Sequence, residues 1–194
     1  MTFDELNKLV ADRYLESVVQ KKTRAEVEED MEDFFFEFLV DAYVSGLYEP
    51  ELGIFPDYSA DRAIELLNAD VGEDHKTYVE RLREHVRNGE LPKLLVLADT
   101  EYHRMYETGK FDCATQAKAQ GRTVLKHWHN MGDEKVRLTH VYLGGVSVPL
   151  DEYFYTIDGD YGRFPGDFQM AENNCNCRCS ISYSATRNGG RNRR

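Results

Sequence analysis

The first half of the chain places its apolar residues at the spacing of α-helices. Thr2 and Glu5 form a capping box, in which a hydroxyl and a carboxylate bind N–H groups left free in the first turn of a helix. One apolar face follows at helical spacing: Leu6, Val10, Tyr14 and Val18. A second capping box, Thr23 and Glu26, predicts another helix, which ends at Gly46.

The second predicted helix contains an aromatic run. Residues 34–40 read FFFEFLV, which is apolar on nearly every side of a helix. Either both flanks are buried within this chain, or one flank is buried and the other binds a partner. The candidate partner-binding residues are Phe34, Phe35, Phe36 and Phe38.

Turn and cap residues predict four more helices before the pattern changes at Gly121. The signals are Ser59 and Asp74 as N-caps, Asn88-Gly89 as a C-cap, Pro92 in a first turn, Gly109 as the end of that helix, and Asp112 as the cap of the last one.

After Gly121 the residues alternate with the period of a β-strand. Val124, Lys126 and Trp128 fall on one face, opposite the face that holds Leu125, His127 and His129. Gly144-Gly145 followed by VSVPL predicts a tight hairpin. A closing strand would place the following residues on one face: Cys177, Cys179, Ile181 and Tyr183.

These patterns predict an α+β fold, in which a helical N-terminal half is followed by a small α+β module with short antiparallel strands. Residues 1–90 are expected to form the helical region and to bind a partner. Residues 91–185 form the module. Residues 186–194 form a basic tail that is expected to be disordered.

Composition narrows the function. The net charge of −11 opposes wrapping of nucleic acid, except at the arginine-rich tail. No apolar run approaches the roughly 20 residues that cross a bilayer, so no membrane association is expected. The N-terminus lacks the pattern of a secretory signal, which favours a reducing cytoplasm and argues against a disulfide framework for the four cysteines.

Three cysteines alternate near the end of the chain, at Cys175, Cys177 and Cys179. With Cys113 or a histidine they could bind zinc, but zinc sites typically use two separated ligand pairs and the second pair is missing. Small buried thiols are the simpler interpretation, with a disulfide formed after cell lysis as a further alternative. No cofactor is therefore expected.

Asp133, Arg137 and His140 lie one helical turn apart, so a helix would place them on one face. Such a trio could perform acid–base chemistry or bind phosphate. The alternative is structural, because a histidine and an arginine can tie an irregular loop by donating to backbone carbonyls.

Three further residues have simple structural interpretations. Glu101 lies on an amphipathic helix, where a carboxylate usually faces solvent. Asp167 follows Pro165-Gly166 and is expected in an Asx-type turn. Trp128 is expected in the core, because it lies on the predicted buried face of a strand.

Read in order, several short motifs resemble the minor head protein family of tailed phages typified by the F protein of phage Mu. The resemblance covers roughly residues 92–183. It rests on Ala98-Asp99-Thr100-Glu101, Lys126 with Trp128, Asp133 to His140 in the pattern D-x-x-V-R-x-x-H, Gly145, Asp151-Glu152-Tyr153-Phe154, Pro165-Gly166-Asp167, and Asn176-Cys177-Arg178-Cys179.

The resemblance implies a virion structural protein, present in few copies inside the head or at the portal vertex and used in head morphogenesis or genome delivery. The expected partners are the portal protein and capsid or scaffold proteins, met first in the host cytoplasm. The module would be held together, without catalysis, by Trp128, Arg137, His140, Pro165, Asp167, Asn176, Cys177, Arg178 and Cys179.

Two positions depart from the family pattern: Asp99 stands where the family has arginine, and Gly144 where it has aspartate. An enzyme of transferase or hydrolase type, acting on nucleotide or protein substrates, is the alternative. Its candidate residues are Glu101, Asp133, Arg137 and His140. A third hypothesis is an accessory protein that binds packaged DNA through the arginines of the tail: Arg187, Arg191, Arg193 and Arg194.

Overall fold

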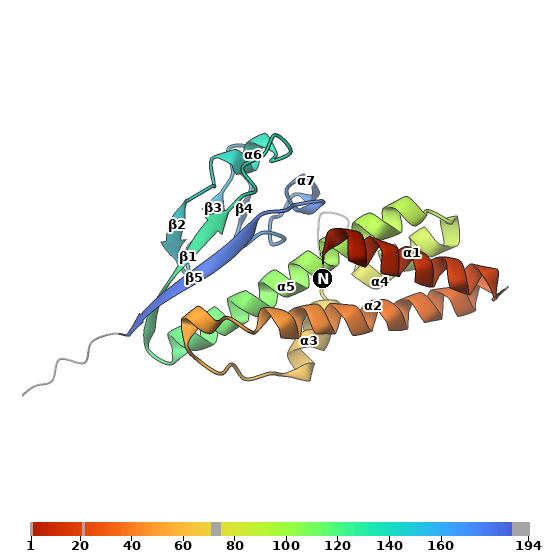
Figure 1. Cartoon of the computed structure of the whole chain (residues 1–194), viewed down its shortest axis with the longest axis horizontal. Coiled ribbons are helices and arrows are strands. Elements are labelled where there is room, and N and C mark those ends of the chain that lie inside the picture. Colours follow the sequence, from red (N-terminus) through yellow and green to blue (C-terminus); the bar gives the residue numbers. More distant parts are fainter. Residues whose placement is uncertain (1, 21, 71–74, 188–194) are drawn as a thin grey trace, which may run out of the picture.

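The computed structural model describes residues 2–20, 22–70 and 75–187 (Figure 1). The helical half contains α1 (Phe3–Val19), α2 (Arg24–Gly46), the 3₁₀ turn η1 (Pro50–Leu52), α3 (Ala60–Leu67), α4 (Tyr78–Asn88) and α5 (Leu91–Ala119). The second half contains β1 (Arg122–His129), α6 (Leu138–Val141), β2 (Ser147–Pro149), β3 (Phe154–Tyr155), β4 (Tyr161–Gly162), α7 (Ala171–Asn174) and β5 (Ser180–Arg187). The predicted α+β fold is confirmed.

Capping boxes start the first two helices, as the sequence predicts. The Thr2 hydroxyl accepts a hydrogen bond from the Glu5 N–H at 3.3 Å, and the Glu5 carboxylate accepts one from the Thr2 N–H at 2.7 Å. Thr23 and Glu26 make the same two bonds, at 3.3 and 2.6 Å. Each pair satisfies two N–H groups that a helix start otherwise leaves unbonded.

Helix α4 begins later than predicted. Its N-cap is Thr77, whose hydroxyl accepts from the Glu80 N–H at 3.3 Å, whereas the predicted cap, Asp74, lies outside the described residues. The end of the helix is as predicted, because Gly89 adopts the left-handed conformation (φ +67°) that glycine tolerates at a C-cap.

The aromatic run of α2 mostly fills the core of this chain. Phe35 and Phe38 are buried and Phe34 is partly buried, which corrects the expectation that these side chains face a partner. Phe36 is 43% exposed and is the member of the run that remains accessible. On α1 the predicted face is right at its start but Val18 is exposed, because the helix turns Ser17 inward instead.

Helix α5 is one continuous helix, so the predicted break at Gly109 is wrong. Gly109 faces Gly46 of α2 at a point where the two backbones nearly touch. A Cβ atom on Gly46 would lie 2.0 Å from the carbonyl oxygen of Tyr106, and one on Gly109 would lie 2.2 Å from that of Tyr43. The glycines therefore permit a close helix crossing: Gly46 lies at the end of α2, and Gly109 lies within α5 without ending it.

Asp112 is likewise a contact residue rather than a helix cap. Its carboxylate accepts hydrogen bonds from the Tyr43 hydroxyl at 2.9 Å and from Arg62 Nε at 3.1 Å. These bonds join α5 to α2 and α3.

The larger sheet has the order β2-β1-β5, and both pairings are antiparallel. Strand β1 buries Val124, Lys126 and Trp128, as its alternation predicts. The connection from β1 to β2 spans residues 130–146 and contains α6, so the predicted tight hairpin there is wrong. A short hairpin instead joins β3 to β4 through Gly159, whose φ is +88°.

Strand β5 also changes the predicted limits of the tail. It continues to Arg187, so Thr186 and Arg187 are paired with β1 rather than disordered. The rest of the predicted tail, residues 188–194, lies outside the described residues. Among residues 2–20, 22–70 and 75–187, no helix combines the length and apolar character needed to cross a membrane.

Helix α5 joins the two halves. It packs against α1, α2 and α4 on one side and against β1 and β5 on the other (Figure 1). The division of the chain at residue 90 into a helical region and a module stays a prediction, because the helix that begins at Leu91 belongs to the packing of both halves.

The close crossing of α2 and α5 can be tested with Gly46→Ala. We expect the added Cβ to lower the free energy of unfolding by about 2–3 kcal/mol, because backbone atoms must move to accommodate it. Helix propensity alone predicts the opposite sign, a stabilisation of up to about 1 kcal/mol. Urea unfolding followed by the fluorescence of Trp128, the single tryptophan, gives the measurement.

The matched control is Ser45→Ala, at the exposed neighbouring position of the same helix. We expect it to change the free energy of unfolding by less than about 0.5 kcal/mol. A Gly46→Ala protein as stable as the wild type would contradict the close crossing.

Candidate functional site

Trp128 is the centre of the second half. Its side chain is fully buried and packs edge-on against three rings. The ring centroids lie 5.5 Å away for His140, 5.1 Å for Phe154 and 5.7 Å for Phe168. Such edge-to-face pairs stabilise beyond simple burial of apolar area. The prediction that Trp128 is a core residue is confirmed.

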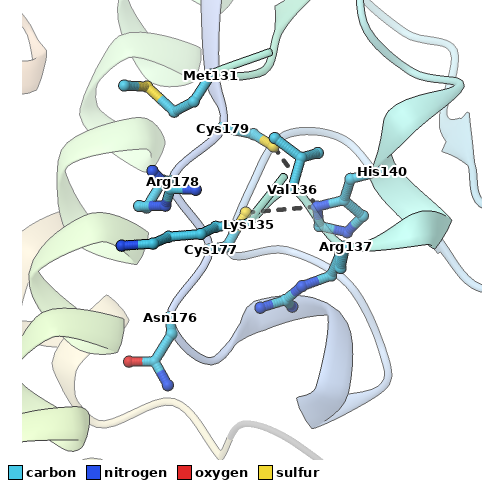
Figure 2. Close-up of a pocket in the computed structure, with 9 residues that line it drawn as sticks. All are labelled: Met131, Lys135, Val136, Arg137, His140, Asn176, Cys177, Arg178 and Cys179. Atoms are coloured by element: carbon cyan, nitrogen blue, oxygen red, sulfur yellow. Dashed lines mark hydrogen bonds between the residues drawn. The ribbon is translucent and has the colours of Figure 1, made fainter. Parts of the chain in front are cut away.

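His140 meets two of the cysteines inside this core (Figure 2). Its Nδ1 atom lies 3.5 Å from Cys177 Sγ and 3.6 Å from Cys179 Sγ, and all three side chains are buried. Cys175 is only partly buried and is not part of this cluster, and Cys113 is buried in α5. All four cysteines of the chain are described and all are free thiols.

Arg137 ties two segments together through backbone carbonyls. Its guanidinium donates to the carbonyl oxygens of Glu172 and Cys175, the second at 2.5 Å. Both acceptors lie just before the Asn176–Cys179 segment. This is the structural arrangement considered from the sequence, in which an arginine fixes an irregular loop.

Asp133 and Arg178 form a second tie nearer the surface. Two hydrogen bonds join them, at 2.8 and 2.6 Å, and both side chains are about two-fifths exposed. These bonds from Arg178 lower the pKa of Asp133 to about 2, so the carboxylate stays charged at neutral pH. A carboxylate with so low a pKa has little affinity for a proton at that pH, so it is a poor general base.

Glu101 is buried, which corrects the expectation that it faces solvent. Its carboxylate accepts from Arg104 Nε at 2.8 Å, and Arg104 also donates to the carbonyl oxygen of Leu66 at 3.3 Å. The Pro165-Gly166 turn packs directly against α5 at Arg104. A Cβ on Gly166 would lie 3.1 Å from the Cα of Arg104, so the turn needs glycine both for this approach and for its φ of +93°.

Asp167 acts across one turn of the chain rather than in the predicted Asx-type turn. Its carboxylate accepts from the Arg163 backbone N–H at 2.8 Å and from the Arg163 guanidinium at 2.9 and 2.7 Å. These bonds close the loop that contains buried Pro165.

Asn176 has a conformational role in the backbone. Its side chain is exposed, and its φ of +53° is a left-handed conformation that asparagine tolerates better than most residues. The residue therefore turns the chain between Cys175 and Cys177.

The four residues of the enzyme alternative do not converge on one pocket. Arg137 and His140 line a small cavity of about 10 Å³, together with the Asn176–Cys179 segment. Asp133 and Glu101 are not in its lining, and each is engaged with its own arginine. The cavity has room for about one water molecule and none for a nucleotide or peptide.

A larger cavity, of about 270 Å³, lies between α1, α5 and residues 177–180. Asp99, His103 and Glu107 present three titratable groups to it from successive turns of α5. Burial raises the pKa of Asp99 to about 6 and that of Glu107 to about 7, and it lowers the pKa of His103 to about 4. We call Asp99, His103 and Glu107 the stripe on α5. The sequence analysis did not identify it.

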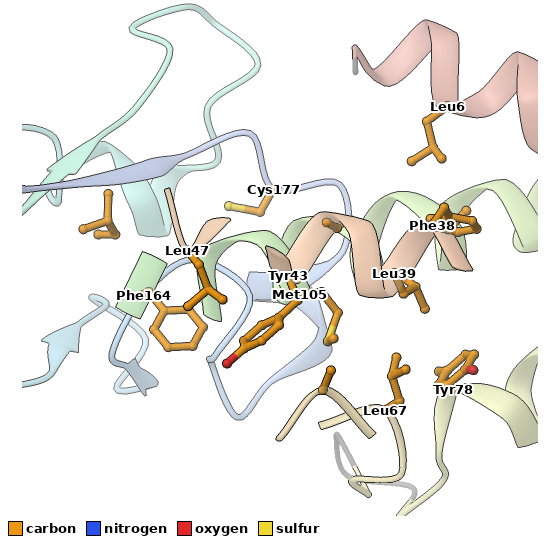
Figure 3. Close-up of a cluster of buried hydrophobic side chains, with 14 of the residues drawn as sticks. Leu6, Phe38, Leu39, Tyr43, Leu47, Leu67, Tyr78, Met105, Phe164 and Cys177 are labelled. Carbon is orange, nitrogen blue, oxygen red and sulfur yellow. The ribbon is translucent and has the colours of Figure 1, made fainter. Parts of the chain in front are cut away.

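The middle of α5 is enclosed by apolar side chains from both halves (Figure 3). Glu107 is buried between them, and its Oε1 atom lies 3.5 Å from Lys110 Nζ. Lys110 Nζ also donates to the carbonyl oxygen of Ile181 in β5. The Lys110 ammonium group thus offsets the charge of the buried Glu107 carboxylate, and it also forms a hydrogen bond to strand β5.

Two polar groups that the sequence interpretation missed support the module. Lys126 is fully buried, donates to the carbonyl oxygen of Arg163 at 2.8 Å and lies over the rings of Phe111 and Phe154. Burial lowers its pKa to about 8. The available signal was its position on the buried face of β1, between Val124 and Trp128.

Asp160 is the other missed group. Its buried carboxylate accepts from three backbone N–H groups and from the side chain of Asn173 at 2.9 Å. The backbone donors are Tyr161, Gln169 and Met170. A carboxylate with this many donors organises the loop before α7, and the Asp158-Gly159 turn signal beside it was the only hint in the sequence.

Comparison with known proteins gives a family and two curated relatives. Residues 67–182 match the family described as Phage Mu protein F like protein. The minor head protein GP7 of Bacillus phage SPP1 is 34% identical over 112 residues, which are 58% of this chain and 36% of that protein. No solved structure matches.

The second relative is an enzyme. The NAD(+)--arginine ADP-ribosyltransferase EFV of Enterococcus faecalis (strain ATCC 700802 / V583) is 35% identical over 86 residues, which are 44% of this chain and 18% of that protein. The chain therefore spans about a third of one curated relative and about a fifth of the other.

The tie made by Arg137 can be tested with Arg137→Lys. We expect the free energy of unfolding to fall by about 1.5–3 kcal/mol, because an ammonium group cannot reach both carbonyl oxygens with the geometry of a guanidinium. The control is Arg178→Lys, which alters an exposed ion pair and should cost much less stability than Arg137→Lys. Equal losses for the two variants in urea unfolding would contradict the role given to Arg137.

Asp99→Asn tests the burial of the stripe on α5. The folded-state pKa of Asp99 is about 6, against an ordinary value of 3.8, so charging this carboxyl destabilises the fold as pH rises between those values. After allowance for partial exposure, we expect the variant to be more stable by about 1–2 kcal/mol above pH 6. The stability advantage of the variant should shrink as pH falls from 6 to 4. If urea unfolding gave the same stability difference between variant and wild type at every pH, the burial of Asp99 would be contradicted.

Proposed function

Because this chain belongs to the Phage Mu protein F like family, we propose that it functions as a minor head protein of a tailed phage, with a structural role. The structural role is supported chiefly by the contacts that Arg137, Asp133 and His140 make. Each of them is engaged with residues 172–179 or lies against them, and together they do not form a substrate-sized pocket. The similarity to the SPP1 minor head protein GP7 supports the same function.

The finer part of the proposal concerns location and partners. We place the protein in the virion, at the portal or the capsid interior, after assembly in the host cytoplasm, where it acts in head morphogenesis or genome delivery. The helical half would meet the portal, capsid or scaffold protein. Its exposed apolar side chains support this: Leu9, Leu15, Val18, Val19, Phe36 and Val44.

Packaged DNA is a further proposed partner of the C-terminal arginines. Arg187 ends strand β5, and Arg191, Arg193 and Arg194 follow it in the sequence. Contacts of this kind are made with phosphate groups and weaken steeply with salt. The net charge of −11 limits such binding to this end of the chain.

An enzyme of transferase or hydrolase type is the second candidate. The observation that favours it is the similarity to the Enterococcus ADP-ribosyltransferase, together with the larger cavity beside Asp99 and Glu107. The separation of Glu101 and Asp133 from the His140 cavity weakens it. The similarity covers less than a fifth of that enzyme, so it gives little support for transfer of the activity.

Co-expression with the portal protein of the same phage tests the proposal. We expect the full chain to co-elute with the portal ring at a fixed ratio in size-exclusion chromatography with mass determination. Phe36→Asp should reduce the bound fraction at least about tenfold, as for loss of one buried aromatic anchor. Tyr155→Asp, at an exposed aromatic of the β3–β4 hairpin, is the matched control and should bind as the wild type does.

The contrary outcome is equally specific. A folded chain that elutes alone in the presence of portal, capsid and scaffold proteins would contradict the assembly role and favour the enzyme candidate. Equal loss of binding in both variants would contradict the assignment of the contact to α2.

A further inference from the structure

The cluster of His140, Cys177 and Cys179 brings together three groups that bind metals. His140 comes from α6, whereas the two thiols lie 37 and 39 residues later, just before β5. Their ligand atoms lie within 4.8 Å of one another and all three side chains are buried. We propose that His140 Nδ1, Cys177 Sγ and Cys179 Sγ bind one zinc ion, which joins these two segments.

The distances are those that a tetrahedral zinc ion requires. Zinc binds sulfur at about 2.3 Å and imidazole nitrogen at about 2.0–2.1 Å, and tetrahedral angles then separate the sulfur and nitrogen atoms by about 3.6 Å. The observed separations from His140 Nδ1 are 3.5 Å to Cys177 Sγ and 3.6 Å to Cys179 Sγ. Both sulfur-to-nitrogen separations therefore match those of a tetrahedral zinc site, and the two sulfur atoms lie within 4.8 Å of each other.

Hydrogen bonding to His140 accounts for only one of the two sulfur contacts with its Nδ1 atom. A ring nitrogen of a neutral imidazole either donates one proton or accepts with one lone pair. Two sulfur atoms approach the same nitrogen, so at most one of the contacts is a full hydrogen bond. A metal ion between the three atoms satisfies all of them at once.

The surroundings provide room for a fourth ligand. The cavity of about 10 Å³ beside these side chains matches one water molecule, which would complete the tetrahedron. The His140 ring is oriented by Trp128 and Phe168, which pack against it. Its Nε2 atom is buried without a hydrogen-bond partner among the described residues, so the contacts of these two rings are what hold this ligand in place.

The charges balance when the metal binds. Zinc(II) replaces the protons of the two thiols, which pass to the solvent, and two thiolates then neutralise the ion. A neutral, buried centre of this size suits a structural metal better than a substrate site.

This ligand set differs from the one considered in the sequence. The histidine considered there is His140, whereas Cys175 drops out, because Asn176 turns the chain and leaves Cys175 outside the cluster. The site would fix the 130–146 connection to the start of β5, beside the tie that Arg137 makes. It is independent of any assembly partner, so it can fail or succeed separately from the function proposed above.

Zinc binding can be measured on the full chain. The protein is purified under reducing conditions, stripped with a chelator, and titrated with Zn²⁺ and separately with Co²⁺. We expect one Zn²⁺ per chain to survive gel filtration, and Co²⁺ to give sulfur-to-metal charge transfer and the visible bands of tetrahedral cobalt. Zn²⁺ should also protect Cys177 and Cys179, but not Cys175, from alkylation mapped by mass spectrometry.

Substitutions identify the ligands. Cys177→Ser and Cys179→Ser should each lower the affinity for Zn²⁺ more than about 100-fold, beyond the effect typical of residues that only support a ligand. Cys175→Ser is the matched control and should bind Zn²⁺ as the wild type does. A folded wild-type chain that retains no Zn²⁺, equal alkylation of all three thiols with Zn²⁺ present, or loss of binding in Cys175→Ser would overturn the site.

Discussion

Burial of α5 on two sides is the constraint on which the rest of the structure depends. One side meets α2 so closely that Gly109 cannot carry a side chain, and the other side meets β1 and β5. Charged groups on such a helix lose their contact with water and must be compensated within the protein. Glu101 is accordingly paired with Arg104, and Glu107 with Lys110, each three residues further along the same helix.

The second half of the chain is stabilised by a compact aromatic core and by polar ties as well as by the β1–β5 pairing, since its other strands are short. Strands β3 and β4 have two residues each and cannot define a fold by backbone pairing alone. Trp128 supplies the core, whereas Arg137 and Asp160 bind the irregular loops through backbone groups. Residues that resemble a catalytic set by type therefore serve mainly to connect segments, which agrees with an assembly role.

Local signals in the sequence predicted local structure well, and tertiary contacts account for the errors. Capping boxes and alternation gave the starts of α1 and α2 and the buried face of β1, because these depend on neighbouring residues. Gly109 was misread as a helix end because its partner, Gly46, is distant in sequence. The burial of Glu101 was missed for the same reason, because the turn that packs against its partner Arg104 lies more than 60 residues later.

The continuity of α5 has a mechanical consequence. Its 29 residues span about 43 Å at the rise of an α-helix, and no loop interrupts them between the helical half and the sheet. A displacement of one end of α5 is therefore passed along its main-chain hydrogen bonds to the other end, because no loop within the helix absorbs it. Because α5 packs against both halves, it couples the orientation of the helical half to that of the sheet.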